Sequence, residues 1–407
     1  MAAAVTQMLA SYTTDWLDLV FRWFHVIAAI VWIGTSFYFV ALDNHLHEPE
    51  READRDEGVG GESWEIHGGG FYVIRKYRVA PPKLPEPLHW YKWEAYWTWL
   101  SGFALFCVLY YADARLRLID PTVADLEPWQ AILISIGLLA AAWVVYDATC
   151  RLLAGRPLLL GVAILGLTTG AAYGVGELYS ARAAYLQVGA MLGTVMAANV
   201  FFVIIPGHWE LVRAKEAGRE PDPRPGVLGK QRSVHNNYLT LPVLFSMLAG
   251  HFTFTYTHDH AWAVLVALMA VGAAIRHYFN RRHAGETLWW IPVGCAAAIA
   301  AIAVWLRPPG APAAQAGAAG VPFADVQRVV AARCQPCHSQ HPTYTGVGEA
   351  PLGVAFDTPE EIRARAEQIR QLAVVSTAMP LGNATKMTKA ERELLGRWVA
   401  AGAKIAP

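Results

Sequence analysis

The residues whose spacing indicates the clearest chemistry are two cysteines and a histidine in the segment CQPCH, namely Cys334, Cys337 and His338. A C-x-x-C-H spacing is typical of covalent haem c attachment: the two thiols add across the vinyl groups of haem, and the histidine takes one axial position on the iron. A chance pair of cysteines and a redox disulfide are the alternatives. The amphipathic helix predicted at 323–333, directly before the motif, favours the haem site.

A six-coordinate haem iron needs a second axial ligand, and the best candidate is Met379, which precedes Pro380 well downstream of His338. A methionine thioether raises the reduction potential of haem, which suits an electron acceptor. Met387 and His341 are competitors, but His341 is too close to His338 in sequence to reach the opposite haem face easily. The sequence therefore predicts that His338 and Met379 bind the iron.

Three ionisable residues, Arg22, His25 and His251, lie inside long apolar segments. Such groups are expensive to place in a membrane and mark functional sites. Two imidazoles that face each other at one depth would suit a non-covalent haem b, so His25 and His251 are candidate haem b ligands as well as candidate catalytic residues. Arg22, one helical turn from His25, is a candidate for binding an anion. The alternative for each histidine is an ordinary hydrogen bond between helices.

The chain that must position these residues has 407 residues, of which 55% are hydrophobic and 16% charged. That composition is too apolar for a soluble protein of this length. The net charge is zero, so the chain lacks the basic footprint of a nucleic-acid-binding protein. We therefore expect a membrane protein with a soluble part attached and no nucleic-acid partner.

Eight segments are long and apolar enough to cross a hydrocarbon core about 30 Å thick. They lie at 16–41, 93–112, 129–147, 157–179, 183–206, 236–257, 260–279 and 288–306. The predicted fold is all-α, with an eight-helix transmembrane bundle in residues 1–307. A Pro, Ala and Gly-rich linker is expected at 308–322, followed by a small class I cytochrome c domain at 323–407 whose last helix lies at 388–402.

Loop charges predict the orientation of the bundle, because Lys and Arg in short loops stay on the cytoplasmic side. The loops before the second, fourth, sixth and eighth spans hold most of these residues, whereas the N-terminal tail and the other loops hold few. Both chain ends are therefore expected outside the cytoplasmic membrane, together with the haem attachment segment.

The first cytoplasmic loop has two segments with their own patterns. Residues 67–79 begin with three glycines and then alternate apolar and basic residues, which predicts a short strand or hairpin. Residues 88–99 are unusually aromatic. Aromatic rings and arginines could clamp a flat anionic heterocycle by stacking and paired hydrogen bonds. An interfacial aromatic belt beside cytoplasmic positive charge is the alternative.

Three stretches together carry a family resemblance: RWFHVIAAIVWIGTSFYFVALDNHL at 22–46, HGGGFYVIRKYRVAPPKLPEPLHWYKWEAYWTWLSGF at 67–103, and CQPCH at 334–338. The chain resembles the bacterial membrane-bound urate oxidases (urate hydroxylases) that carry a C-terminal cytochrome c domain. The resemblance implies oxidation of urate to 5-hydroxyisourate in purine catabolism, with electrons passing to haem c and on to a cytochrome c or terminal oxidase. It also implies an inner-membrane protein whose cytochrome domain is periplasmic, since haem is attached covalently only outside the cytoplasmic membrane.

The implied half-reaction sets requirements for the site. Urate is a monoanion that loses two electrons and two protons and gains water at C5, so a cationic clamp and a proton acceptor are needed. The candidate clamps are Arg22, Arg75 and Arg78, and the candidate proton acceptors are His25, His251, Glu94, Asp43 and Glu177. If urate binds near the cytoplasmic loop, electrons must cross most of a core about 30 Å thick, which requires a relay within the bundle.

Two other classes of function remain open at this point. In one, the bundle is an electron-transfer subunit that takes electrons from quinol or another dehydrogenase and has no purine site. In the other, it is a transporter or porphyrin-handling membrane protein, which the segment FHVIAAIVWIG in the first span faintly resembles. Reduction by urate in the absence of oxygen separates the enzyme from both.

Overall fold

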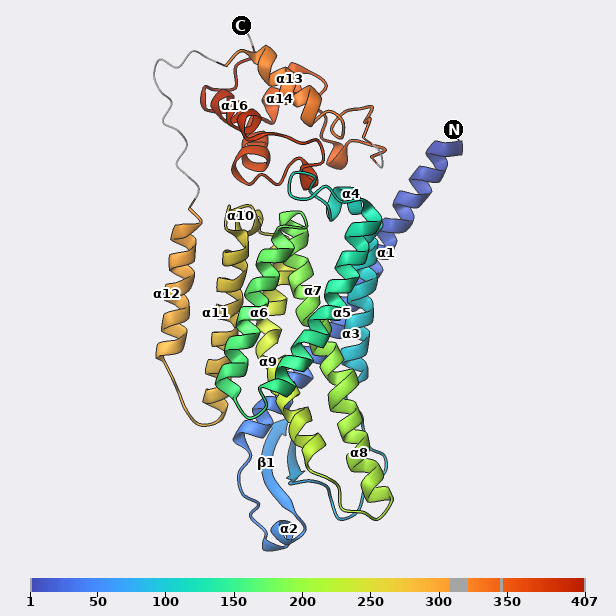
Figure 1. Ribbon diagram of the computed structural model, residues 1–407, viewed down its shortest axis with the longest axis vertical. Coiled ribbons are helices and arrows are strands. Elements are labelled where there is room, and N and C mark those ends of the chain that lie inside the picture. Colours follow the sequence, from blue (N-terminus) through green and yellow to red (C-terminus); the bar gives the residue numbers. More distant parts are fainter. Residues whose placement is uncertain (1, 308–320, 345–346, 406–407) are drawn as a thin grey trace.

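The computed structural model describes residues 2–307, 321–344 and 347–405 of the chain. In these residues the protein is mostly helical, with one two-stranded sheet (Figure 1). Most of the predicted linker at 308–322 lies outside the described residues. The expectation of a predominantly α-helical chain is therefore confirmed, and the hairpin is the main addition to it.

Helices cover all eight predicted spans. They are α1 (Ala2–His45), α3 (Trp93–Phe106) with the π-helical η1 (Cys107–Tyr111), α5 (Pro128–Leu152), α6 (Pro157–Gly176), α7 (Ala181–Asn199) with the π-helical η2 (Val200–Ile204) and α8 (Ile205–Glu216), α9 (Arg224–Ala249), α11 (Ala261–His283) and α12 (Trp290–Trp305). The largest departure is α9, for which the sequence predicted 236–257. It begins earlier and ends at Ala249, because the residues after it form the separate short helix α10 (Thr253–Tyr256).

Five of the described helices are long and apolar enough by themselves to cross a membrane: α1 from Tyr12, α5, α6, the continuous helix from α7 to α8, and α11. α12 is apolar but shorter. α9 does not meet the criterion although it is long, because polar side chains occupy its buried face. Four of these, at Arg232, Asn236, Asn237 and Thr240, are almost fully buried.

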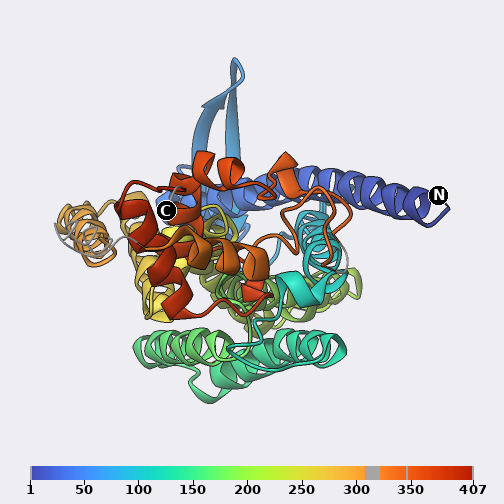
Figure 2. The same ribbon diagram turned by 90° about the horizontal axis from the view of Figure 1, so that it is seen from above.

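The helices form layers around α7 and α9. Seen from above in Figure 2, α5 and α6 lie along one side and α1 along the other. α9 packs between α7 and α11, and α1 packs mainly on α3. α12 lies at the edge, where it contacts α11 and leaves Val293 and Val304 exposed. Such exposed apolar faces are expected of helices that contact lipid.

The two ends of the bundle differ. The N-terminus, α4 (Ala114–Arg117), α10 and the C-terminal domain lie at one end, and the loop sheet and α2 (Glu52–Asp56) lie at the other (Figure 1). The loops rich in Lys and Arg are therefore at the end opposite the C-terminal domain, as the loop charges predicted.

The loop sheet is an antiparallel hairpin of β1 (Val59–His67) and β2 (Gly70–Tyr77). Its turn contains Gly68 and Gly69, whose φ angles of +57° and +84° lie in the left-handed region that glycine adopts most easily. The predicted strand or hairpin at 67–79 is thus confirmed. β1 was not predicted, because its two glycines and two glutamates obscure the alternation.

The C-terminal domain contains α13 (Phe323–Arg333), α14 (Pro359–Ala364), α15 (Ala366–Ile369) and α16 (Lys389–Ala400), with short turns η3 (Pro351–Gly353), η4 (Arg370–Val375) and η5 (Leu381–Asn383). α13 and α16 coincide with the predicted first and last helices. Thr388 begins α16 with a reciprocal capping box to Glu391. Phe323 packs against Trp398, so the two helices close one apolar core.

Candidate functional site

The segment expected to hold haem c follows α13 directly. Cys334 ends that helix, and its carbonyl accepts hydrogen bonds from the backbone N–H groups of Cys337 and His338, at 3.1 and 2.8 Å. The His338 Nδ1 lies 2.9 Å from the carbonyl oxygen of Val354. When Nδ1–H donates to that carbonyl, Nε2 carries the free lone pair, which is the tautomer an iron ligand needs.

Both thiols of the motif are free, so the structure has no disulfide between Cys334 and Cys337. Burial raises the pKa of Cys334 to about 12, although nearby Arg392 opposes the shift. Burial also raises the pKa of Cys337. Unassisted, these are neutral thiols and poor nucleophiles, which does not favour a redox role for them.

The three candidates for the second axial ligand differ in their surroundings. Met379 is half-buried at the edge of the apolar core, and its backbone carbonyl accepts a 2.7 Å hydrogen bond from Arg392 Nη1. Met387 is 3% exposed and is a core residue. His341 is exposed. Of the three, Met379 is the one held in a fixed loop at the core edge.

The residues around these groups fit a haem. Cys334 to His338 and Met379 to Ala384 are all half-buried, and they border the apolar core that includes Val330, Phe356 and Leu395. The His338 ring meets Phe356 edge to face at 5.5 Å. The domain thus offers two attachment thiols, two axial donors and an apolar wall, which is the donor set of a covalently bound haem.

The loop after Met379 contacts the membrane bundle. Gly382 has φ +56°, and a side chain there would come within 2.8 Å of the Leu116 carbonyl and 2.9 Å of the Ile119 carbonyl. These carbonyls belong to α4 and the residues after it. Burial lowers the pKa of Arg392, and the carboxylate of Asp120, across this contact, opposes that shift. The glycine at 382 therefore permits a close backbone contact where the expected Met379 ligand loop faces the bundle.

His25 lies against α3. Its Nδ1 is 3.0 Å from the Thr98 carbonyl and 3.2 Å from Ser101 Oγ, and its ring lies over Gly102, where a Cβ would come within 2.7 Å of it. Arg22 is about half exposed and pairs with Asp18 on its own helix at 2.7 Å. The structure therefore places His25 in a defined helix contact but leaves Arg22 in a local ion pair.

His251 was expected in the buried outer half of the sixth span, but α9 ends before it. His251 is exposed in the turn after Ala249, with its backbone N–H on the Leu248 carbonyl. No hydrogen bond or ring contact among the described residues joins it to His25. His251 therefore lies beyond the end of the helix that was expected to contain it.

The loop candidates are largely engaged elsewhere. Arg75 pairs with Asp54 at 3.0 Å and lies 3.7 Å from Glu62, while Asp43 pairs with Lys76 at 2.5 Å. Arg78 and Glu177 are exposed. In the aromatic segment, Trp90 stacks on Trp209 at 4.4 Å, which fixes the loop to α8. This contact favours the packing interpretation of the aromatic residues over a heterocycle clamp.

A set of buried polar side chains that the sequence analysis missed lies between α5, α7, α9 and α11. We call it the inner polar cluster, and it consists of Asn199, Arg232, Asn236, Asn237, Arg276 and Asn280, which are all at most 8% exposed. Its atoms without a hydrogen-bond partner include Asn199 Oδ1, Arg232 Nε and Nη1, Asn237 Nδ2, Arg276 Nη2 and Asn280 Oδ1. Buried polar atoms normally have partners, so several unpartnered atoms together indicate that buried waters or a ligand complete their hydrogen bonds.

On the α5 and α7 side of the cluster, Arg232 Nη2 donates to Asp147 at 2.6 Å. Arg232 also lies over the ring of Tyr146, whose hydroxyl is 2.7 Å from His235 Nδ1. Asn199 donates to this hydroxyl and to Asn236. Asn199 is the residue directly before the π-helical η2, and π-helical turns inside α-helices occur frequently at functional sites.

On the α1 and α11 side, Asn237 Oδ1 accepts hydrogen bonds from Arg276 Nε at 2.8 Å and from Asn280 Nδ2 at 2.9 Å. The guanidinium of Arg276 lies over the ring of Phe37, 3.7 Å from its centre. Two sequence signals point to this side: the consecutive Asn236 and Asn237 in the middle of a span, and an arginine inside the seventh apolar segment.

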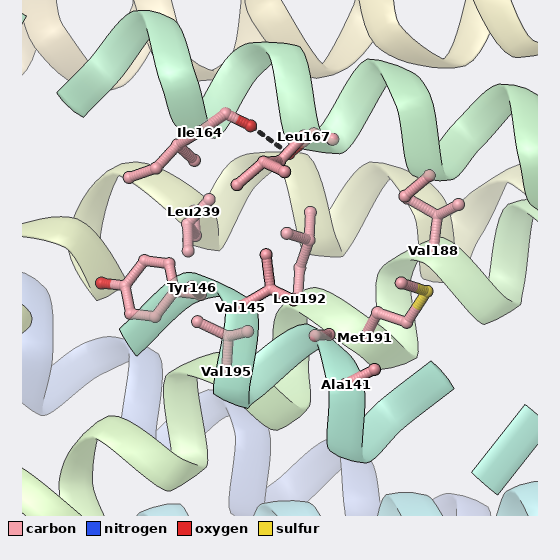
Figure 3. A pocket seen from close by; sticks show the side chains of 13 residues that line it. Ala141, Val145, Tyr146, Ile164, Leu167, Val188, Met191, Leu192, Val195 and Leu239 are labelled. Atoms are coloured by element: carbon pink, nitrogen blue, oxygen red, sulfur yellow. Dashed lines mark hydrogen bonds between the residues drawn. The ribbon is translucent and has the colours of Figure 1, made fainter. Parts of the chain in front are cut away.

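A separate pocket between α5, α6, α7 and α9 is apolar (Figure 3). Its wall contains Val145, Ile164, Met191 and Leu239, with Tyr146 at the boundary to the inner polar cluster. It offers no charge to an anion. A groove of this composition suits a lipid chain better than a purine.

One comparison with known proteins supports the urate oxidase part of the resemblance in the sequence. A family model described as urate oxidase N-terminal matches residues 11–307, which includes all the helices of the bundle. The comparison with curated proteins found no match, and neither did the comparison with solved structures.

The contact at Gly382 yields a prediction about how the two parts of the chain are joined. Gly382→Val should push the Met379 loop away from Leu116 and Ile119, so amide hydrogen exchange in residues 114–120 should become faster. Gly353→Val is the matched control, since Gly353 also has a positive φ, +66°, but no atom near its missing side chain. Equal exchange in both variants would show that the contact does not hold the domain.

Proposed function

Because the chain belongs to the urate oxidase N-terminal family, we propose that it oxidises urate at the membrane and passes the electrons to a covalently bound haem c in its C-terminal domain. The family supports urate as substrate and an oxidoreductase activity. The C-x-x-C-H segment, with a His338 tautomer suited to an iron ligand, supports the haem as electron acceptor. The match over residues 11–307 is the observation that carries the proposal.

The proposed reaction converts urate and water to 5-hydroxyisourate, two electrons and two protons. When bound, haem c supplies a one-electron acceptor, so one turnover delivers its electrons in two steps. His338 and Met379 would hold the iron, and the carbonyl of Val354 keeps the proton of His338 on Nδ1. Arg392 fixes the Met379 backbone. The electrons then pass to a cytochrome c or terminal oxidase of the respiratory chain.

The proposal places the chain in the bacterial inner membrane. Five apolar helices of sufficient length support a membrane location, and the basic loops at the end opposite the C-terminal domain support a periplasmic position for that domain. A haem reduced in that domain would then be accessible to external electron carriers, while the basic end of the bundle would face the cytoplasm.

We also propose that His25 binds a haem b inside the bundle. Its Nδ1 is engaged by the Thr98 carbonyl, which leaves Nε2 for iron, and the missing side chain of Gly102 lets the ring pack closely against α3. His251, the other expected ligand, has no comparable support because it is exposed beyond the end of α9. A hydrogen bond that only joins α1 to α3 is the competing role of His25.

Anaerobic mixing with urate tests the proposed reaction. Urate alone should reduce the c-type haem of the purified full chain within the time of enzymatic turnover, as seen in the visible absorbance. Cys334→Ala with Cys337→Ala should abolish urate consumption, because the acceptor is no longer attached. Reduction by quinol with none by urate would instead support an electron-transfer subunit.

The choice of axial ligand gives a second prediction. Met379→Leu should lower the reduction potential of haem c and slow its reduction by urate, since the thioether ligand raises the potential. Met387→Leu is the control: it is a volume-conserving change in the core that should cost less than about 1.5 kcal/mol and leave the potential unchanged. The reverse pattern, with the potential sensitive to Met387 alone, would assign the ligand to Met387.

The haem b proposal is tested by pigment content. A pyridine haemochrome spectrum of the wild-type protein should show b-type haem in addition to c-type haem, and His25→Ala should lose the b-type signal only. His251→Ala should keep both, because its side chain lies at the exposed rim. A wild-type spectrum with c-type haem alone would refute the proposal.

A further inference from the structure

Arg276 is a buried cation without a protein counter-charge. It is 4% exposed, and no Asp or Glu among the described residues forms an ion pair with it. Its contacts are an amide oxygen and an aromatic ring. A charge enclosed by helices in a membrane is costly unless an opposite charge approaches it, and such residues mark substrate or ion sites.

Arg232, the other arginine of the inner polar cluster, shows the contrast. It is equally buried at 3%, but Asp147 pairs with it at 2.6 Å, and Asp147 also binds Arg151 at 2.7 Å. Arg232 therefore has a carboxylate partner within the protein. Among the described residues, no such partner is found for Arg276.

One edge of the Arg276 guanidinium carries two N–H donors, and only one of them has a partner. Its Nε–H donates to Asn237 Oδ1, and its Nη2, on the same side of the planar group, has no partner. Nε–H and Nη2–H of an arginine point in nearly the same direction, which is why arginine binds planar acceptors through two parallel hydrogen bonds. Nη2 therefore has N–H donors beside Asn237 that are not hydrogen-bonded.

The open atoms of this side lie close to one another, because Arg276 and Asn280 both donate to the single oxygen Asn237 Oδ1. Because Arg276 Nε–H can only donate, the Asn237 atom that accepts from it must be the oxygen, and the Asn280 atom that donates to this oxygen must be the nitrogen. What remains is two donors, at Arg276 Nη2 and Asn237 Nδ2, and one acceptor, at Asn280 Oδ1. A ligand edge that alternates C=O and N–H groups satisfies all three.

An aromatic ring, that of Phe37, covers one face of the Arg276 guanidinium. Phe37 covers the guanidinium of Arg276, 3.7 Å from the ring centre, so a ligand that meets the fork lies in or near the plane of the guanidinium. The Asn44 amide donates to the Asn280 carbonyl at 3.3 Å and holds the end of α1 against α11. A planar ring is favoured over a branched or tetrahedral anion.

The site lies near the basic end of the bundle. Arg276 is seven residues before the end of α11 at His283, which is about 10 Å along the helix. Arg281 and Arg282 occupy that end, and Lys76 and Lys230 flank Asp43 close to the end of α1. Positive charge at the rim attracts anions from that side.

We infer that Arg276, Asn237 and Asn280 form the binding site for the purine anion, which enters from the basic end of the bundle. This inference rests on the proposed function for the identity of the ligand. Urate has the required features: it is planar, it carries one negative charge, and its edges alternate carbonyl and N–H groups. Arg276 balances the charge of urate, and Asn237 and Asn280 form hydrogen bonds with the carbonyl and N–H groups along its edge.

The competing role is structural, in which buried waters complete the hydrogen bonds and the cluster only joins α9 to α11. The two roles differ in what a substitution changes. A structural residue alters stability without ligand, whereas a binding residue alters the affinity for urate.

The test measures the urate-dependent rise in melting temperature of the full-length protein in detergent, without oxygen and with the haem reduced beforehand so that no turnover occurs. Asn280→Ala and Arg276→Lys should each weaken urate binding about 10- to 100-fold, which corresponds to the loss of a hydrogen bond to a charged ligand. Arg328→Gln, in the C-terminal domain, where Arg328 is exposed and paired with Asp325, is the control and should bind urate like the wild type. Asn280→Ala removes no charge, so it keeps the test valid if Arg276→Lys does not fold.

The outcomes separate this inference from the proposed function. Wild-type urate affinity in folded Asn280→Ala overturns the purine site but leaves urate oxidation intact. A loss of affinity in Asn280→Ala with normal haem content and an unchanged melting temperature without urate supports it. If the wild type itself shows no urate-dependent shift and no reduction by urate, both the site and the proposed function are wrong.

Discussion

The shortage of partners for polar groups inside hydrocarbon is the constraint on which this structure depends. It makes the spans helical, since helices satisfy their own backbone groups, and it decides what the buried side chains do. Asp147 neutralises Arg232, and Tyr146 and Asn199 share hydrogen bonds with His235 and Asn236. Arg276 is the exception, because only amide and aromatic groups surround it. The chain retains a charge that its own residues do not balance.

Sequence patterns located the elements better than the buried site. Apolar runs placed a helix in every predicted span, because that signal is local, and the equally local C-x-x-C-H spacing predicts the haem segment. His251 was misplaced because the apolar and aromatic run continues past Ala249, although the helix ends there. Arg232 was counted among the cytoplasmic loop charges, and Arg276 has charged neighbours in Arg281 and Arg282 that conceal it. Only the packing of α9 on α7 and α11 shows that these residues share one interior.

The proposed sites are arranged along α1. Phe37 lies against Arg276, and His25 is 12 residues earlier, which is about 18 Å along a helix. His25 is thus closer to the end where Gly382 meets the residues after α4. In the proposed reaction, a purine near the basic end and a haem in the C-terminal domain would be too far apart for one efficient electron-transfer step, and His25 lies between these two ends. The π-helical η1 and the residues of α4 complete the connection to the C-terminal domain.

The contact between Phe37 and Arg276 joins the first span to the seventh. During synthesis α1 leaves the ribosome early, whereas Arg276 emerges only after five further predicted spans have been made. The two residues cannot meet until nearly the whole bundle has been inserted, and the haem-binding segment is translated later still. A chain that ends before α11 therefore lacks the cation–π contact that covers the ring of Phe37, and the first span completes its packing only late in synthesis.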